Sequence, residues 1–243
     1  MDDFVKFTNW LYADCPYYVP DLEMDIRNTF NLRKNAGLEY SVLQPFIAYN
    51  EAGKPVGRIA GIINYQANQK WQTKNVRFGF IDFIDDLEVS AALLKAVEQW
   101  GKEYGMNYIQ GPMGIFDFDK EGMLIEDFDK LGSMITIYNY PYYPKHCLCS
   151  PSSAIQNYQT NKWICMSNDI PADRQANAAR HTKNEEIIGV AITMGSLSHA
   201  LQKAKGKLFP LGWYHLVRAL KWKKEEKVEL LLIAVRPDYQ GLG

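Results

Sequence analysis

Two glycines stand close together in the last stretch of the sequence, directly after an apolar run. In "LLLIAVRPDYQGLG" (230–243) the run ends at Val235 and a turn begins at Gln240. Gly241 and Gly243 leave backbone N–H groups uncovered, and bare amides at the start of a helix bind phosphate groups. The spacing predicts a phosphate site at this turn. The alternative is a plain glycine turn, which is the commoner outcome after a strand.

The cysteines and two histidines form a second group, because thiolates and imidazoles bind zinc. Cys147 and Cys149 lie near His146, while Cys165 and His181 follow further along the chain. Their C-x-C spacing differs from the C-x2-C pairs of structural zinc sites, and the remaining residues do not pair in the usual rhythm. We therefore predict no metal site.

The overall charge favours no class of charged partner. The 243 residues include 27 Lys and Arg against 28 Asp and Glu, a net charge of −1. A basic run spans 203–224, but Glu225 and Glu226 follow at once, as on a solvated helix face. His199 and His215 stand alone on the expected helices, and no motif places a serine, a histidine and an aspartate together. We expect no nucleic-acid partner and no nucleophilic hydrolysis.

No part of the sequence has the composition of an export or membrane segment. Asp2 and Asp3 follow Met1 where a signal peptide would carry basic and then apolar residues. No apolar run approaches the roughly 20 residues that span a bilayer. A reduced cytoplasmic protein without a membrane partner is the simplest expectation.

The first half of the chain has the period of strands and then of a helix. We expect an aromatic strand or edge segment within 1–20 and a hairpin over 46–64. A strand is expected over 76–84, with Phe78, Phe80, Asp82 and Ile84 on one face. An apolar stripe at helical spacing predicts a helix over 87–104, followed by a strand over 107–111. Residues 113–146 are expected to be loop with a short helix. This order is typical of an α/β or α+β layer.

The second half repeats that rhythm more loosely. Strands are predicted over 185–194 and 227–235, with short helices over 196–206 and 213–221 between them. Residues 147–184 show neither period nor enough apolar content, so we predict a linker there.

The closing turn resembles motif A of the GCN5-related N-acetyltransferase superfamily, in which V-x-P-x-Y-[RQ]-G-x-G leads into a helix. The matching residues are Val235, Pro237, Tyr239, Gln240, Gly241 and Gly243. The resemblance implies that acetyl-CoA is the co-substrate, with its pyrophosphate held at Val235, Gln240, Gly241 and Gly243. It also implies an amine acceptor, a small molecule or peptide whose identity the sequence does not give.

The resemblance extends upstream, to a bacterial group of tandem acetyltransferase-like proteins. "GKPVGRIAGIIN", "GFIDFIDDLEVSAALL", "IQGPMG" and "NYPYYPKH" are similar to its N-terminal half, and 190–221 is similar to its second module. This implies an α/β (α+β) fold with a mixed central sheet flanked by helices. We expect a near-complete but degenerate module over 1–146, an atypical linker over 147–184 that reflects a deletion or frame error, and a partial second module over 185–243, whose motif would continue past its end.

The same resemblance places the first module's equivalent turn in "FIDDLEVSAALL" (83–94). No glycine bares the amides there, and Asp85 and Asp86 already occupy the positive end of the helix. Two carboxylates would repel a pyrophosphate, so we predict a structural helix that caps itself and binds no cofactor.

Two residues are candidates for acid–base chemistry in the second module. Glu229 lies on the strand that leads to Gln240, where related acetyltransferases carry a general base. The alternative is a solvated glutamate beside Lys227. Tyr239 is a candidate proton donor to the leaving thiolate, and its alternative is simple packing.

The sequence therefore predicts an acyl-CoA-dependent N-acetyltransferase-like protein, inactive if the second site is incomplete. The alternative is a non-catalytic binding or scaffold protein with a degenerate acetyltransferase fold. Such a protein would offer aromatic surface to its partner through Trp10, Tyr17, Tyr18, Tyr142 and Tyr143.

Overall fold

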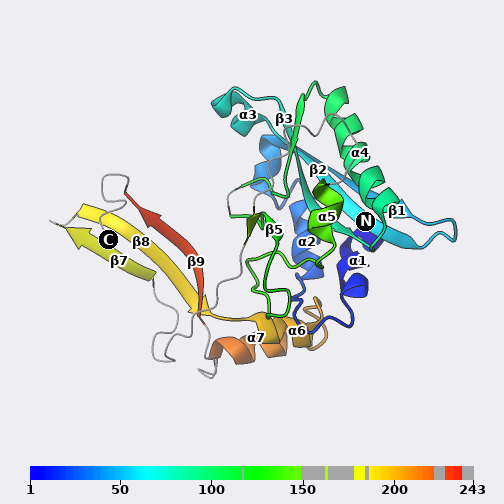
Figure 1. Ribbon diagram of the computed structural model, residues 1–243. Helices are drawn as coiled ribbons and strands as arrows, with labels where there is room; N and C mark the ends of the chain where they lie inside the picture. Colours follow the sequence, from blue (N-terminus) through cyan, green and yellow to red (C-terminus); the bar gives the residue numbers. More distant parts are fainter. Residues whose placement is uncertain (117, 149–161, 164–177, 184–185, 222–227, 237–243) are drawn as a thin grey trace.

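The computed structural model spans residues 1–243 and describes all of them except 117, 149–161, 164–177, 184–185, 222–227 and 237–243 (Figure 1). Its main sheet has the strand order β1-β2-β3-β4, with bounds Ser41–Tyr49, Pro55–Asn64, Asn75–Phe83 and Tyr108–Gln110. The first three strands are antiparallel, and β4 runs parallel to β3. The expected mixed α/β fold, a mixed sheet with flanking helices, is confirmed.

The predicted hairpin is confirmed, and its turn has a local cause. The Asn50 side-chain oxygen accepts the backbone N–H groups of Ala52 and Lys54, which is a typical turn-forming role of asparagine. Gly53 has a φ of +72°, a conformation that glycine adopts without steric cost.

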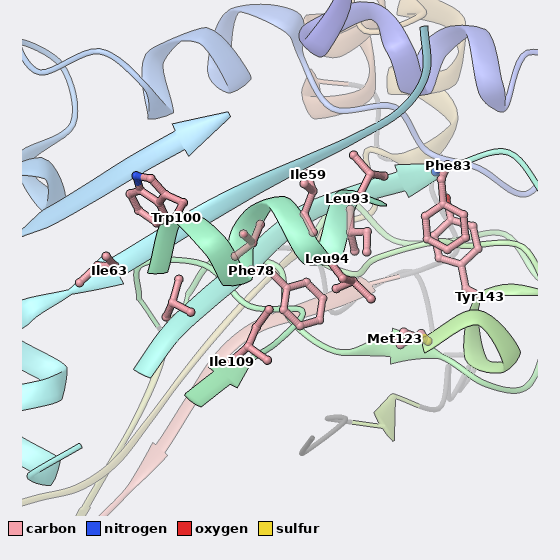
Figure 2. Packing of buried hydrophobic residues seen from close by; sticks show 13 residues of the cluster. Ile59, Ile63, Phe78, Phe83, Leu93, Leu94, Trp100, Ile109, Met123 and Tyr143 are labelled. Atoms are coloured by element: carbon pink, nitrogen blue, oxygen red, sulfur yellow. The ribbon is translucent and has the colours of Figure 1, made fainter. Parts of the chain in front are cut away.

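Helix α4 (Leu87–Glu103) covers one face of the main sheet. Ile59 and Ile63 of β2 point into the core beneath it, together with Leu93 and Leu94 of the helix (Figure 2). Gly61 must be small, because a Cβ there would lie 2.6 Å from the Trp100 ring. The helix predicted from its apolar stripe is confirmed to within a residue.

The opposite face of the sheet is covered by α1 (Asp2–Leu11) and α2 (Glu23–Thr29). The expectation of a strand or edge segment within 1–20 was wrong. Phe4, Phe7 and Thr8 are buried at the i, i+3, i+4 spacing of one helix face, and this period outweighs the aromatic composition. A 3-10 helix (Ala36–Glu39) and α3 (Tyr65–Trp71) complete this part of the chain.

Strand β3 contains an extra residue that reverses which side chains face the core. Ala60 pairs with Gly79, and Arg58 pairs with Asp82. Between these two pairs the chain advances by two residues on β2 but by three on β3. Phe78 therefore packs under α4, whereas Phe80 packs with α1 on the other face. The prediction that Phe78, Phe80 and Asp82 share a face was wrong, because a β-bulge exchanges the two faces of a strand.

The chain after β4 is largely irregular, as expected. It contains β5 (Met123–Leu124), which pairs in parallel with β6 (Lys162–Trp163), and the short helix α5 (Tyr143–Leu148).

A second, antiparallel sheet follows in the order β7-β8-β9, with bounds Ala178–Lys183, Glu186–Gly195 and Val228–Val235. Between β8 and β9 lie α6 (Ser198–Ala204) and α7 (Gly212–Lys221), both at the predicted places (Figure 1). Strand β7 lies within the expected linker, most of which falls outside the described residues. The division of the chain at 146 and 184 stays a prediction.

The two sheets are joined through α6. The Gln202 side-chain amide donates to the backbone oxygens of Pro16 and Tyr18, and the Glu23 N–H donates to the Gly206 oxygen. Among the described residues, no helix has the length and apolar character needed to cross a membrane.

Candidate functional site

Of the six motif residues in the closing stretch, the structure describes only Val235. Val235 is the last residue of β9 and lies opposite Gly189 of β8. Tyr239, Gln240, Gly241 and Gly243 fall outside the described residues, so their assigned roles stay predictions.

Glu229 is a buried carboxylate surrounded by hydroxyl groups. Its side-chain oxygens accept hydrogen bonds from Ser133 at 2.7 Å, Ser196 at 2.6 Å and Ser198 at 3.2 Å. The residue is only 9% exposed. The alternative of a solvated glutamate beside Lys227 was therefore wrong. Burial of a carboxylate is tolerated when several donors replace water.

The hydroxyl groups around Glu229 come from both parts of the chain. Ser196 and Ser198 belong to the β8–α6 junction, whereas Ser133 comes from the irregular segment after β5. The N-cap residue of α6 is Leu197, which makes no side-chain cap bond, and the Ser196 hydroxyl oxygen accepts the N–H of Ser198. Through Ser133, Glu229 bonds the second sheet to the first region, which we define as residues 1–148.

The helix start that follows β3 is closed by its own side chains, as predicted. The Asp86 carboxylate accepts the N–H of Glu88 at 2.8 Å and that of Val89 at 3.5 Å. These are the amides that a phosphate would need. Asp85 is engaged by the His146 ring at 2.9 Å.

The end of β3 is also covered by two tyrosine hydroxyls from the α5 region. Tyr142 donates to the Phe83 oxygen at 2.6 Å, and the Phe83 N–H donates to the Tyr143 hydroxyl oxygen at 3.0 Å. The Tyr143 ring stacks on the Phe83 ring, as Figure 2 shows. This strand end offers no free backbone group at Phe83 to a cofactor.

The structure brings a serine, a histidine and an aspartate together, which the sequence did not predict. Ser90 Oγ lies 3.0 Å from His146 Nδ1, and His146 Nε2 lies 2.9 Å from Asp85 Oδ1. However, Ser90 is 2% exposed, lines neither described pocket, and bonds the Leu87 oxygen of its own helix. A nucleophile must reach its substrate. We interpret this trio as a structural link between α4 and α5.

The cysteines and histidines form no metal site in the part of the chain that the structure describes. Within those residues, no group of His, Cys, Asp and Glu side chains is placed to hold a metal ion. Cys149 and Cys165 fall outside them.

The predicted aromatic docking surface is largely internal. Tyr143 is 1% exposed, so its inclusion was wrong, and Tyr17, Tyr18 and Tyr142 are half-buried. Trp10 is exposed, with the Lys54 ammonium 3.9 Å from its ring. Tyr17 and Tyr18 pack against the cluster of Tyr12 and Tyr138, whereas Tyr142 and Tyr143 lie against Phe83.

The first region contains a cavity of about 310 Å³ on the α1–α2 side of the sheet. Its wall is formed by α2, by β2 and β3 at the bulge, and by the segments 112–123 and 134–139. Sequence periodicity did not reveal it, because its wall combines segments far apart in the chain.

A buried ion pair forms part of the cavity wall. The Arg58 guanidinium contacts Asp82 Oδ2 through Nε and Nη2, both at 2.9 Å, and donates to the Phe4 oxygen through Nη1. The Asp82 side chain also accepts from Tyr12 at 3.0 Å. Burial raises the pKa of Asp82, and the Arg58 charge opposes that shift. The two charged groups can pair because the bulge turns Asp82 toward Arg58.

Two buried phenols complete this network. The Tyr12 and Tyr143 hydroxyls lie 2.9 Å apart, and burial raises the pKa of both well above the usual value of a tyrosine. Both phenols therefore stay protonated and act as hydrogen-bond donors near neutral pH. At the bulge, Phe80 has a φ of +51°, a region that non-glycine residues rarely occupy.

Comparisons with known proteins find similarity over parts of the chain only. Protein YghO of Escherichia coli (strain K12) is 35% identical over 143 residues, which are 59% of this chain and 36% of that relative. The chain thus spans little more than a third of the relative's length. A solved acetyltransferase from Bacillus cereus ATCC 14579 matches 28% of this chain and 46% of its own, with 19% identity and a TM-score of 0.22. No protein-family model matches the chain.

Proposed function

We propose that this chain is part of an N-acetyltransferase-type protein that takes acetyl-CoA at the turn after β9. The observation that carries the proposal is the strand itself, which stays paired with β8 as far as Val235. A regular strand thus leads directly toward the Gln240-Gly241 turn of the sequence. This is the setting in which glycine amides hold a pyrophosphate.

Acetyl-CoA would supply the acetyl thioester, and an amine of unknown identity would receive the acetyl group. The amine must lose a proton before it attacks, and in this proposal Glu229 accepts it, directly or through one of its bonded serine hydroxyls. Tyr239 returns a proton to the leaving thiolate. The first region supplies no cofactor site, since Asp86 occupies its helix start.

Calorimetric titration of coenzyme A into this chain tests the proposal. We expect heat of binding with the wild type and at least a tenfold loss of affinity in Gly241→Trp, because an indole would cover the amides. Asp86→Ala is the matched control at the other strand end and should bind coenzyme A as the wild type does.

Two results would count against the proposal in different ways. Absence of heat for this chain alone would limit the assignment to ancestry. Absence of heat also for a chain extended beyond Gly243 would overturn it.

A scaffold role is the second candidate, and α7 provides the observation in its favour. Trp213, Val217 and Leu220 are exposed at the i, i+4, i+7 positions of one helix face. No acidic residue occurs over 187–224. A partner with an apolar groove and an acidic rim would match this face.

Light scattering and affinity capture test the scaffold role. We expect the wild type to retain a defined acidic partner that the Leu220→Lys variant loses. A strictly monomeric chain that retains no partner in either form would contradict it.

A further inference from the structure

The cavity beside Arg58 has the size of a ligand site. Its volume of about 310 Å³ lies at the lower end of the roughly 300 to 1,000 Å³ that small-molecule pockets occupy. It is enclosed by α2, the bulge of β3 and the 134–139 segment, all within the first region. None of the residues that line it belongs to β9.

Both cationic groups of the cavity wall are already engaged. Arg58 is bonded to Asp82 and to the Phe4 oxygen, and its side chain is 3% exposed. The Lys120 ammonium lies 2.6 Å from Asp21. An anionic ligand would have to displace a carboxylate from one of them, so the wall disfavours carboxylates, phosphates and coenzyme A.

One carboxylate of the cavity wall, that of Asp25, has no hydrogen-bond or ion-pair partner among the described residues. Asp119 accepts the N–H groups of Ile115 and Phe116. Among the described residues, by contrast, no hydrogen bond or ion pair of the Asp25 carboxylate is found. Asp25 is an exposed residue of the wall, and partial burial of its carboxyl group together with the charge of Asp21 raises its pKa.

The described residues of the wall therefore carry an excess of negative charge. They include four aspartates, at 21, 25, 82 and 119, against Arg58 and Lys120. A cation inside the cavity would offset part of this excess and would favour the ionised form of Asp25.

The rest of the wall is mostly apolar. Ile26, Ile62, Phe80, Ile81 and Met113 line it from α2, both strands of the bulge and the chain after β4. Apolar side chains beside the Asp25 carboxylate match a ligand with an apolar body and a charged end.

From this charge balance and wall we infer that the cavity binds a small organic cation, an amine with an apolar body whose ammonium group pairs with Asp25. The amine is bound here rather than acetylated, because the helix start of this region is closed by Asp86. The inference does not rest on the proposed function, and the site needs no coenzyme A.

Calorimetry with three ligands of one shape tests the charge requirement, using the purified chain without coenzyme A. Phenethylamine is the cationic probe, 2-phenylethanol the neutral one, and 3-phenylpropionate the anionic one. We expect phenethylamine to bind at least tenfold more tightly than either of the others. Equal affinities, a preference for the anion, or no heat with phenethylamine would overturn the inference.

Two variants locate the site. Asp25→Asn should weaken phenethylamine binding at least tenfold, whereas Asp129→Asn, an exposed aspartate outside the wall, should leave it unchanged. Met134→Trp fills the cavity with a bulky ring and should abolish binding in a protein whose circular dichroism matches the wild type. Unchanged binding in both Asp25→Asn and Met134→Trp would overturn the location. Since coenzyme A is absent from all of these titrations, their outcome leaves the proposed function untouched.

Discussion

Strands β3 and β9 differ in the residues that follow them in the sequence. After β3 come Asp85 and Asp86, and the Asp86 carboxylate accepts the first amides of α4. After β9 come residues whose sequence holds two glycines and no acidic group beyond Asp238. A capping carboxylate satisfies the amides and neutralises the helix end, so an anion gains nothing there. Side chains at one or two positions therefore decide whether a strand end can hold a phosphate.

The surroundings of β3 reinforce the difference. Tyr142 and Tyr143 bond the backbone of Phe83 and fill the space beside it. Removing the aspartate cap alone would not open this end of the strand. Core packing therefore occupies this strand end, and the cavity of the first region lies on the α1–α2 side of the sheet.

The largest expected effect concerns the charge pair that the bulge of the first region brings together. Arg58→Leu should lower the free energy of unfolding by about 3 to 5 kcal/mol, because it leaves Asp82 buried without its partner. Urea unfolding measures this. The double variant Arg58→Leu, Asp82→Leu should recover a large part of the loss. A single-variant loss below about 1 kcal/mol would show that the pair is solvated.

A smaller effect is expected at the contact between the two regions. Glu229→Leu removes the acceptor of three serine hydroxyls and should cost about 2 kcal/mol in unfolding free energy. Ser133→Ala removes one of these bonds and should cost about 1 kcal/mol, measured by the same urea titration. If Glu229→Leu unfolds at the wild-type urea concentration, the carboxylate does not join the regions.

The smallest expected effect concerns the two strand ends themselves. Asp86→Ala should cost about 1 kcal/mol in unfolding free energy, since it removes a helix cap. We also expect it to leave the first region without affinity for coenzyme A, because the tyrosines still cover Phe83. Calorimetry on a Gly241→Trp background measures coenzyme A binding by the first region alone, because this substitution blocks the proposed site after β9. New heat when coenzyme A is titrated into the double variant Asp86→Ala, Gly241→Trp would mean that the cap alone closes the site.

The local elements were predictable where one period dominates. The stripe of α4, with Leu93 and Val97 buried, and the hairpin turn at Gly53 both follow from spacing and residue type. Helix α1 was missed because its aromatic residues were weighed by composition, although Phe4, Phe7 and Thr8 have helical spacing. The burial of Glu229 could not be predicted, since two of its partners precede it by about thirty residues and the third by almost a hundred.

The sequence by itself determined the hairpin, helix α4 and the aspartate cap before it, because these depend on neighbours along the chain. Only the tertiary structure decided the cavity and its charges. One extra residue in β3 turns Asp82 toward Arg58 and Phe80 toward α1. That choice of face depends on how β3 pairs with β2, and alternation along a single strand contains no information about its partner.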